Sequence, residues 1–253
     1  MDNLTIVIIT KNEASYINSI VKTWQHLAPV LVVDSNSWDQ TAEIAVAAGA
    51  KVIQQSWLGF GRQKQFAIEQ AETDWVLSID ADEWPSETLI LSLKNLRLED
   101  PSVAFEIKRQ SYFLGLRVKF CGWGNDYVLR LFNKRYGRFD SRVVHEKVIH
   151  GGIIKRVSGC LIHQSYKDRR DILRKTARYG RLTAQHVLSR KRHINAPTVR
   201  RFLAPWWAIF RTLVLKAGFL DGLTGIRIAK MNGMTVERKY QLVSRAIKRQ
   251  QSS

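Results

Sequence analysis

The first eighty residues alternate short, largely apolar runs with stretches of helical periodicity, and this alternation limits the folds open to the chain. The apolar runs are Leu4–Thr10, Val30–Val33, Lys51–Gln54 and Trp75–Ile79. The first two are rich in β-branched residues, which is typical of strands buried on both faces of a parallel sheet. Strands that alternate with helices of this length predict βαβ units, and therefore an α/β fold with a mostly parallel sheet and flanking helices.

Polar side chains follow three of these strands at the point where each strand ends. They are Thr10, Asn12 and Glu13 after the first strand, Asp34 after the second, and Asp80 and Asp82 after the fourth. In open α/β sheets, ligands bind outside the carboxyl ends of the strands. One acidic residue after a strand is a weak signal, but four at three strand ends predict a ligand site.

The segment Asp80-Ala81-Asp82 closes the apolar run Trp75–Ile79. Side chains alternate along a strand, so we expect both aspartates to project to the same side. Neighbouring carboxylates repel unless a cation or a proton lies between them, and Mg²⁺ or Mn²⁺ prefers such oxygen ligands. The alternative is an acidic loop that caps the following helix through Ser86 or Asp82.

Two common nucleotide-binding signatures are absent from this sequence. A dinucleotide site needs G-x-G-x-x-G at the first strand–helix turn, but Lys11-Asn12-Glu13 contains no glycine. The run Gly59-Phe60-Gly61-Arg62 follows another strand and lacks the third glycine, and no P-loop string occurs. The remaining interpretation is a nucleotide held by carboxylates, with a metal at the paired aspartates bridging its diphosphate.

Four segments, in this order along the chain, resemble those of a known family: TKNE (10–13), VVDSNSWDQT (32–41), GFGRQKQ (59–65) and SIDADE (78–83). Together they resemble the nucleotide-sugar half of family-2 glycosyltransferases with the GT-A fold, over roughly residues 4–165. The sequence is most similar to bacterial lipopolysaccharide inner-core β-1,4-glucosyltransferases, which transfer glucose from UDP-glucose to the first heptose. This resemblance implies an inverting, metal-dependent hexosyltransferase. Transfer to a polyprenyl phosphate or another glycan, and a non-catalytic basic adaptor, are the alternatives.

The resemblance also implies roles for the strand-end residues. Glu13 and Asp34 would contact uridine, with Thr10 and Asn12 shaping the pocket. Asp80 would lie near the ribose and the metal, with Ala81 beside it in the donor site, and Asp82 would ligate Mg²⁺ or Mn²⁺. A carboxylate can accept hydrogen bonds from the uracil N–H or from ribose hydroxyls.

Two basic residues of the GFGRQKQ segment are further donor-site candidates. Arg62 and Lys64 can contact the phosphates or the donor sugar. The alternative for both is a solvated helix face.

From Val103 to His163 the pattern changes to shorter, alternating strands, which we interpret as an acceptor half. Trp123 and Gly124 lie in a glycine-flanked aromatic loop, where an indole ring can stack on a sugar and glycine lets the backbone approach it. The alternative for Trp123 is a core residue beside a tight turn.

An inverting transferase needs a base within reach of the acceptor hydroxyl. By the resemblance, this base is Glu146, with Asp126 as the second candidate for base and acceptor binding and with His145 as an orienting neighbour. The pair His145-Glu146 departs from the usual x-Glu-Asp form. An ion pair of Glu146 with Arg142 or Lys147 is the structural alternative.

A histidine near the end of the acceptor half is the remaining candidate ligand. His163 stands where many GT-A enzymes have a further metal ligand. A lone histidine at a strand end is, however, more often structural.

The positive charge of the chain lies almost entirely in its last third. Residues 1–166 hold 19 Lys and Arg against 18 Asp and Glu, whereas residues 167–253 hold 21 against 4. We therefore predict a GT-A catalytic domain at 1–166, with donor and acceptor halves at 1–100 and 101–166, and a basic helical extension at 167–253. Such an extension must face an anionic partner or stay solvated.

The extension contains a dense apolar stretch from Trp206 to Leu220, which Arg211 and Lys216 interrupt. It falls short of the ~20 apolar residues of a spanning helix, so we expect an interfacial helix on anionic lipid. A helix packed on the catalytic domain is the alternative. No zinc-finger, RNP or homeodomain pattern accompanies the charge, so no nucleic acid partner is expected.

The remaining features predict where the protein acts. The N-terminus resembles neither a signal peptide nor an anchor, and Cys121 and Cys160 form no disulfide framework. We expect a peripheral enzyme at the cytoplasmic face of the bacterial inner membrane, acting on a lipid-linked saccharide with a UDP-sugar donor.

Overall fold

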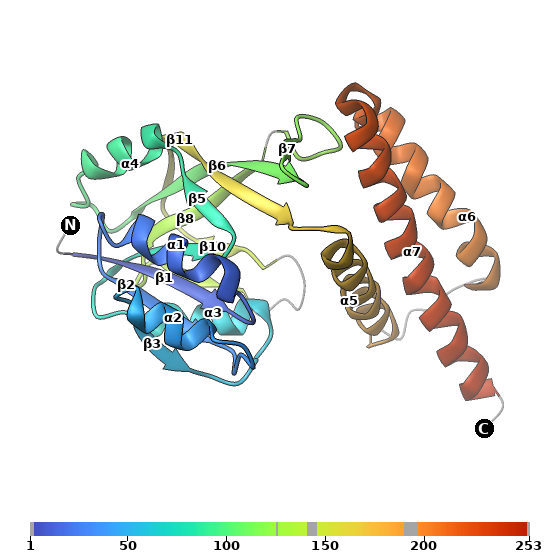
Figure 1. Ribbon diagram of the computed structural model, residues 1–253, viewed down its shortest axis with the longest axis horizontal. Coiled ribbons are helices and arrows are strands. Elements are labelled where there is room, and N and C mark those ends of the chain that lie inside the picture. Colours follow the sequence, from blue (N-terminus) through green and yellow to red (C-terminus); the bar gives the residue numbers. More distant parts are fainter. Residues whose placement is uncertain (1–2, 125, 141–145, 190–196, 252–253) are drawn as a thin grey trace. The chain divides into compact units, whose positions relative to one another are not determined.

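The computed structural model describes residues 3–124, 126–140, 146–189 and 197–251. The chain forms two compact units (Figure 1). The first consists of Met1–Gln110 and Asp126–His163, and the second of Ser111–Asn125 and Gln164–Ser253.

A parallel sheet forms the centre of the first unit. Strand β1 (Leu4–Thr10) pairs in parallel with β2 (Val30–Asp34) and β4 (Trp75–Asp80), and β3 (Lys51–Gln54) pairs in parallel with β2. The connections contain α1 (Ala14–Trp24), α2 (Thr41–Ala47) and α3 (Phe60–Glu69). The predicted α/β class is confirmed, with strand bounds within a residue of those expected.

Antiparallel strands extend this sheet on the β4 side, in the order β3-β2-β1-β4-β8-β6-β11-β5. These strands are β5 (Glu83–Pro85), β6 (Val103–Phe113), β8 (Asp126–Asn133) and β11 (Ile153–Tyr166). The short β7 (Leu116–Arg117) pairs with β6, and β9 (Gly137–Phe139) pairs with β10 (Val148–His150). Helix α4 (Glu87–Lys94) begins at Ser86, whose Oγ accepts a hydrogen bond from Leu89 N at 3.2 Å. Ser86, and not Asp82, therefore caps this helix.

Alternate side chains of β1 enter two different cores. Leu4, Ile6 and Ile8 pack with Ile17 and Trp24 of α1 in the larger cluster. Val7 packs in the other cluster, which includes Ala67 and Ile68 of α3. Because strand side chains alternate between faces, the two faces of the sheet are buried in separate cores.

Strand β11 approaches α4 so closely that it admits no side chain at Gly159. The φ angle of Gly159 is +93°, and a Cβ there would lie 2.3 Å from Leu89 N. We expect Gly159→Ala to lower the free energy of unfolding by roughly 2–4 kcal/mol through overlap and left-handed strain. The matched control is Gly151→Ala, where a Cβ meets nothing within 4 Å. In urea denaturation the control should change stability by less than about 0.5 kcal/mol, and equal effects of the two variants would contradict the packing explanation.

The second unit is mainly helical. Its elements are α5 (Arg169–Ser189), α6 (Pro197–Phe210), the π-helix η1 (Arg211–Leu215), the 3₁₀-helix η2 (Gly218–Asp221) and α7 (Gly222–Gln251). Its core contains Phe113, Val118, Cys121, Tyr166, Ile228 and Met231. The Asp221 carboxylate accepts hydrogen bonds from the backbone N–H groups of Lys119 and Phe120 at 3.0 and 2.9 Å. These bonds join the loop before Asn125 to the helices of the same unit.

Among the described residues, no single helix has the length and hydropathy of a membrane span. The bent pair Val199–Leu215 and Gly218–Ile247, with an angle of 77° between its members, meets those criteria jointly.

Candidate active site

The polar strand ends meet at one edge of the sheet. Register pairs Thr10 of β1 with Asp34 of β2, and Ile9 with Asp80 of β4. The three strands are parallel, so their carboxyl ends lie together and bring Thr10, Asp34 and Asp80 to neighbouring positions. The sequence prediction of a strand-end cluster thus agrees with the sheet topology.

Asp34 organises the first part of this edge. It is fully buried and accepts hydrogen bonds from Thr10 Oγ1 at 2.9 Å, Ser37 N at 2.8 Å and Ser37 Oγ at 2.5 Å. Ser37 Oγ in turn accepts a hydrogen bond from Asn12 N at 2.8 Å. Asn12 has a φ angle of 58°, a conformation that asparagine tolerates better than most residues. Glu13 follows at the start of α1, and its backbone N–H donates to Thr41 Oγ1 at 2.8 Å.

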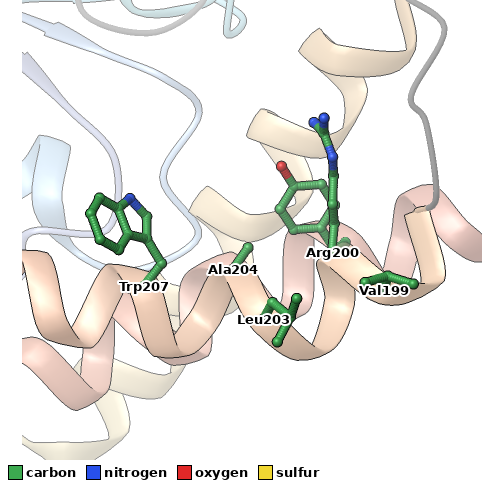
Figure 2. Close-up of a pocket in the computed structure, with 6 residues that line it drawn as sticks. Val199, Arg200, Leu203, Ala204 and Trp207 are labelled. Atoms are coloured by element: carbon green, nitrogen blue, oxygen red, sulfur yellow. The ribbon is translucent and has the colours of Figure 1, made fainter.

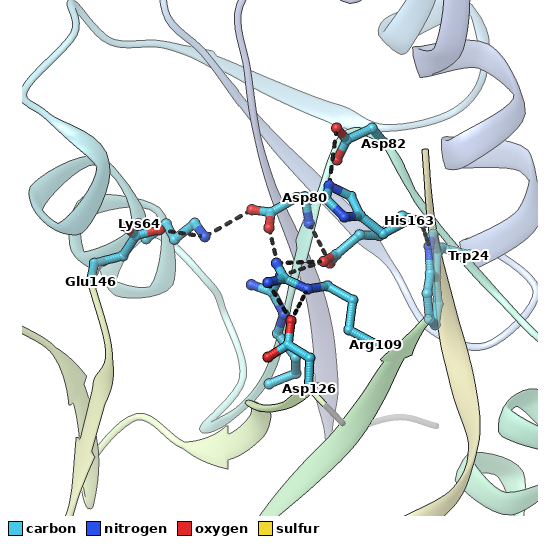
Figure 3. Close-up of polar contacts among 10 residues, drawn as sticks. Trp24, Lys64, Asp80, Asp82, Arg109, Asp126, Glu146 and His163 are labelled. Carbon is cyan, nitrogen blue, oxygen red and sulfur yellow. Dashed lines mark hydrogen bonds and ion pairs between the residues drawn. The ribbon is translucent and has the colours of Figure 1, made fainter. Parts of the chain in front are cut away.

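A chain of alternating charges extends from Asp80 in both directions (Figure 3). In order along the chain of contacts, its members are Glu146, Lys64, Asp80, Arg130, Glu83, Arg109 and Asp126. Four carboxylates thus alternate with three cations, which come from α3, β8 and β6. Each carboxylate lies beside at least one cation, so the cluster is largely neutralised internally.

Lys64 links Asp80 to Glu146. Its Nζ lies 2.8 Å from Asp80 Oδ1 and 3.0 Å from Glu146 Oε1, and its side chain is only 5% exposed. Lys64 is therefore not on a solvated helix face, the alternative to a donor contact, whereas Arg62 on the same helix is exposed. Glu146 pairs with this ammonium group of α3, and Arg142, one partner of the alternative ion pair, lies outside the described residues.

Arg130 links Asp80 to Glu83 in the interior. Its Nη2 lies 2.5 Å from Asp80 Oδ2 and 2.6 Å from Glu83 Oε1, and the Glu83 side chain is fully buried. Burial alone would raise the pKa of Asp80, but Arg130 and Lys64 outweigh burial and hold that pKa well below its ordinary value. The pKa of Arg130 is raised because its two carboxylate partners outweigh the burial of its charge. Asp80 is thus ionised at neutral pH.

Arg109 holds the other base candidate, Asp126. Its Nε and Nη2 donate to Asp126 Oδ2 at 2.8 and 2.6 Å, and its Nη1 lies 3.8 Å from Glu83 Oε1. The β5 backbone is fixed beside this group, because Trp24 Nε1 donates to the Glu83 carbonyl oxygen at 3.3 Å. Asp126 therefore accepts two hydrogen bonds from a guanidinium, while Glu146 accepts from one ammonium group.

Asp82 lies apart from this chain of charges and contacts His163 of β11. Asp82 Oδ2 and His163 Nε2 are 3.4 Å apart. Burial alone would lower the pKa of His163, but the Asp82 carboxylate outweighs burial and raises it above 6.5. The Asp82 carboxylate thus favours the protonated form of the imidazole.

The Asp82 and His163 pair also fits a divalent cation. Two cis ligands at bond lengths of about 2.1 Å lie roughly 3 Å apart, close to the spacing observed here. The described residues include no group of three His, Cys, Asp or Glu side chains arranged around a common metal position. Both oxygens of Asp80 face cations of the protein, so its predicted role as a ligand stays a prediction. Carboxylates commonly share such an ion with substrate phosphates, which complete its coordination.

The other predicted site residues have different positions. Ala81 is buried between the two aspartates. Trp123 packs against the core of the second unit, with its ring centroid 6.4 Å from that of Phe113, and a Cβ at Gly124 would overlap the carbonyl oxygen of Lys119. His145 lies outside the described residues. Acceptor binding by these three residues stays a prediction.

Sequence reasoning missed Arg109 and Arg130, which the structure places at the centre of the site. One signal was available for Arg130. It interrupts the largely apolar segment YVLRLFN (127–133). A charged side chain within a strand that is predicted to be buried requires a partner of opposite charge.

Comparison with known proteins agrees with these observations. A model of glycosyl transferase family 2 matches residues 5–158. An uncharacterised glycosyltransferase of Rickettsia typhi is 27% identical over 96% of this chain and 91% of its own length. The lipopolysaccharide core biosynthesis glycosyltransferase LpsC of Rhizobium meliloti is 29% identical, over 96% and 94%. Glucosyl-3-phosphoglycerate synthase of Mycobacterium tuberculosis, solved with Mn²⁺, UDP and glucosyl-3-phosphoglycerate, has a TM-score of 0.36 and 22% identity over 45% of each chain.

Proposed function

The chain belongs to glycosyl transferase family 2, and we propose that it moves glucose from UDP-glucose onto a heptose of the lipopolysaccharide inner core in β-1,4 linkage, with inversion. The observation that carries this proposal is the convergence of Lys64, Asp80 and Glu146 at the sheet edge that also holds Asp34. The likeness to LpsC along nearly the whole of both chains supports a lipopolysaccharide core acceptor.

In this proposal, the edge of β1 and β2 binds the nucleoside. Asp34 is buried and fixes Ser37, whose Oγ binds the backbone N–H of Asn12, so the nucleoside meets a surface already fixed by hydrogen bonds. Glu13 at the start of α1 would accept a hydrogen bond from the uracil N–H or from a ribose hydroxyl. A pocket arranged before binding loses less conformational entropy when the nucleotide enters.

The diphosphate is placed between Lys64 and the Asp82 and His163 pair. Asp82 and His163 would hold a Mg²⁺ or Mn²⁺ ion, which when bound supplies positive charge that stabilises the departing UDP. Lys64 contributes a second positive charge on the side of Asp80. The incoming phosphates compete with Asp80 and Glu146 for the Lys64 ammonium group, so donor binding and release of Glu146 are coupled.

Glu146 is the proposed base. One ammonium group separates it from Asp80, so it lies beside the donor site and can take the proton of an acceptor hydroxyl as that oxygen bonds to the anomeric carbon. The anomeric carbon–phosphate bond breaks and UDP leaves from the opposite face. Asp126 is the weaker candidate because Arg109 binds it through two N–H groups.

The direct test is to measure UDP release from UDP-glucose with a heptose-terminated core acceptor, with and without Mn²⁺. We expect release that depends on both acceptor and metal. If calorimetry detects no binding of UDP-glucose at millimolar concentration with Mn²⁺, the proposal is wrong. Release with other nucleotide-sugars but not UDP-glucose would reassign the donor.

The Asp82 role has its own expected result. Asp82→Ala should weaken Mn²⁺-dependent UDP binding by at least about 10-fold in calorimetry, because the ion loses a carboxylate ligand. UDP binding measured with EDTA should be the same for both proteins. The matched control is Asp100→Ala, whose carboxylate bonds only to exposed Ser102 in the described structure. A wild-type Mn²⁺ response in Asp82→Ala would contradict the assignment.

A further inference from the structure

The apolar face of helix α6 is turned outward. Its six members are Val199, Phe202, Leu203, Trp206, Trp207 and Phe210, spaced by three or four residues so that they share one side of the helix. All six are exposed, with Trp206 at 72%, Leu203 at 65% and Phe202 at 63%. An amphipathic helix of a globular protein normally buries such a face against its core. Here α6 has the reverse orientation.

The inner side of α6 explains this orientation. Ala208 is buried, and so is Thr212 in the following π-helix, where Thr212 Oγ1 accepts a hydrogen bond from Asn232 of α7 at 3.1 Å. A Cβ at Gly233 would lie 2.9 Å from Ile209, so α7 packs closely on α6 through small and polar residues. The apolar face of α6 is therefore not needed for packing against α7, because the two helices already make a close contact through the opposite side of α6.

Exposed apolar side chains continue beyond α6 through the two short helices into the start of α7. They are Val214, Leu215, Phe219, Leu220 and Leu223, each more than half exposed. Together with the apolar face of α6, these exposed apolar side chains follow one another along the chain from Val199 to Leu223. Monomeric soluble proteins rarely expose contiguous apolar patches of this kind, and those that occur mark protein or membrane contacts.

The charges of this segment identify the partner. Residues 197–223 contain four basic residues, Arg200, Arg201, Arg211 and Lys216, and one acidic residue, Asp221, whose carboxylate is bound by backbone N–H groups. In a symmetric dimer the same patch would meet itself, and these cations would face each other without a counter-charge. Tryptophan beside basic residues instead matches a bilayer surface, where indoles lie at headgroup level and cations meet phosphates.

A groove on this face has the same combination of chemistry (Figure 2). Val199, Arg200, Leu203, Ala204 and Trp207 of α6 line it together with Tyr240 of α7. The apolar side chains of this lining suit an acyl chain, and the guanidinium suits its phosphate.

We propose that the apolar face of α6 and its continuation dock on an anionic lipid surface, with Trp206 and Trp207 inserted at the headgroup level. This inference does not depend on the donor or acceptor of the proposed reaction, because it uses only residues of the second unit. It assigns the membrane contact expected from the sequence to particular side chains.

The test is flotation of the full-length protein with vesicles of phosphatidylcholine alone or with about 30 mol% phosphatidylglycerol. The wild-type protein should float with the anionic vesicles and far less with the neutral ones. The double variant Trp206→Ser/Trp207→Ser should bind the anionic vesicles at least about 10-fold more weakly, because two large apolar side chains no longer insert. Both positions are exposed, so circular dichroism and UDP binding should be unchanged.

The matched control is the double variant Leu91→Ser/Tyr136→Ser, which removes two exposed apolar side chains of the first unit. It should float like the wild-type protein. Equal binding by the tryptophan variant and this control would overturn the proposal. Loss of vesicle binding at high salt in both the wild-type protein and the tryptophan variant would also overturn it, because it indicates charge attraction alone. Self-association of the wild-type protein without vesicles, if the tryptophan variant lacks it, would overturn it as well. Resistance of the bound protein to alkaline extraction would instead indicate a span formed by the bent helix pair.

Discussion

Replacing Glu146 with glutamine is expected to lower the kcat of sugar transfer by at least about 100-fold, the usual contribution of a general base. Glutamine keeps the shape of the side chain and can still accept a hydrogen bond from Lys64, but it cannot take the proton of the acceptor hydroxyl. UDP binding should be retained, since Lys64 and Asp80 remain in place. Turnover with saturating donor and acceptor, compared with UDP affinity from calorimetry, separates these two effects.

Two further variants show whether that loss of kcat is specific to Glu146. Glu69→Gln makes the same chemical change at an exposed position of α3, where Glu69 accepts a hydrogen bond from Gln65 at 2.7 Å, and it should have wild-type turnover. Asp126→Asn tests the other candidate. A larger loss of kcat in Asp126→Asn than in Glu146→Gln would move the base to Asp126, and equal turnover of Glu146→Gln and wild type would exclude Glu146.

The first half of the fold could be predicted because its signals are local. Ile6–Ile9 and Val30–Val33 are apolar without interruption, and this pattern is typical of strands covered on both faces. Once these strands are placed in parallel, the positions of Thr10 and Asp34 at one edge follow from the topology. For the cap of α4 the sequence leaves Ser86 and Asp82 as candidates, and the structure selects Ser86.

The contacts within the site could not be predicted in the same way. Asp80 meets Arg130 because β8 inserts antiparallel beside β4, a pairing between segments fifty residues apart that no local pattern encodes. We expected Asp80 and Asp82 to project to the same side because side chains alternate along a strand. However, β4 ends at Asp80, so this alternation does not extend to Asp82, and Asp82 has a different partner from Asp80. The two carboxylates avoid mutual repulsion by pairing with separate cations of the protein.

Trp123 illustrates another limit of sequence reasoning. Its glycine-flanked loop reads equally well as a sugar platform or as core packing, and the structure gives it a partly buried position in the core of the second unit. Hydrophobic packing and carbohydrate stacking use the same aromatic surface, so residue type alone does not separate them.

The buried arginine provides the largest expected effect on stability. Arg130→Met should lower the free energy of unfolding by roughly 3–5 kcal/mol, because it leaves Asp80 and the fully buried Glu83 without their shared guanidinium. The matched control is Arg135→Met. Arg135 lies 3.0 Å from Asp74 but is 72% exposed, and loss of such a surface pair should cost less than about 1 kcal/mol.

Urea denaturation of the full chain measures both variants, and similar losses in the two would contradict an interior role for Arg130. A third variant separates charge from volume. Adding Glu83→Gln to Arg130→Met removes one of the two carboxylates that lose the Arg130 guanidinium, so the double variant should recover part of the lost stability. If the cost of Arg130→Met came from altered packing alone, Glu83→Gln would add a further loss. A partial recovery therefore identifies the buried charge of Glu83, and not the missing volume of the guanidinium, as the cause.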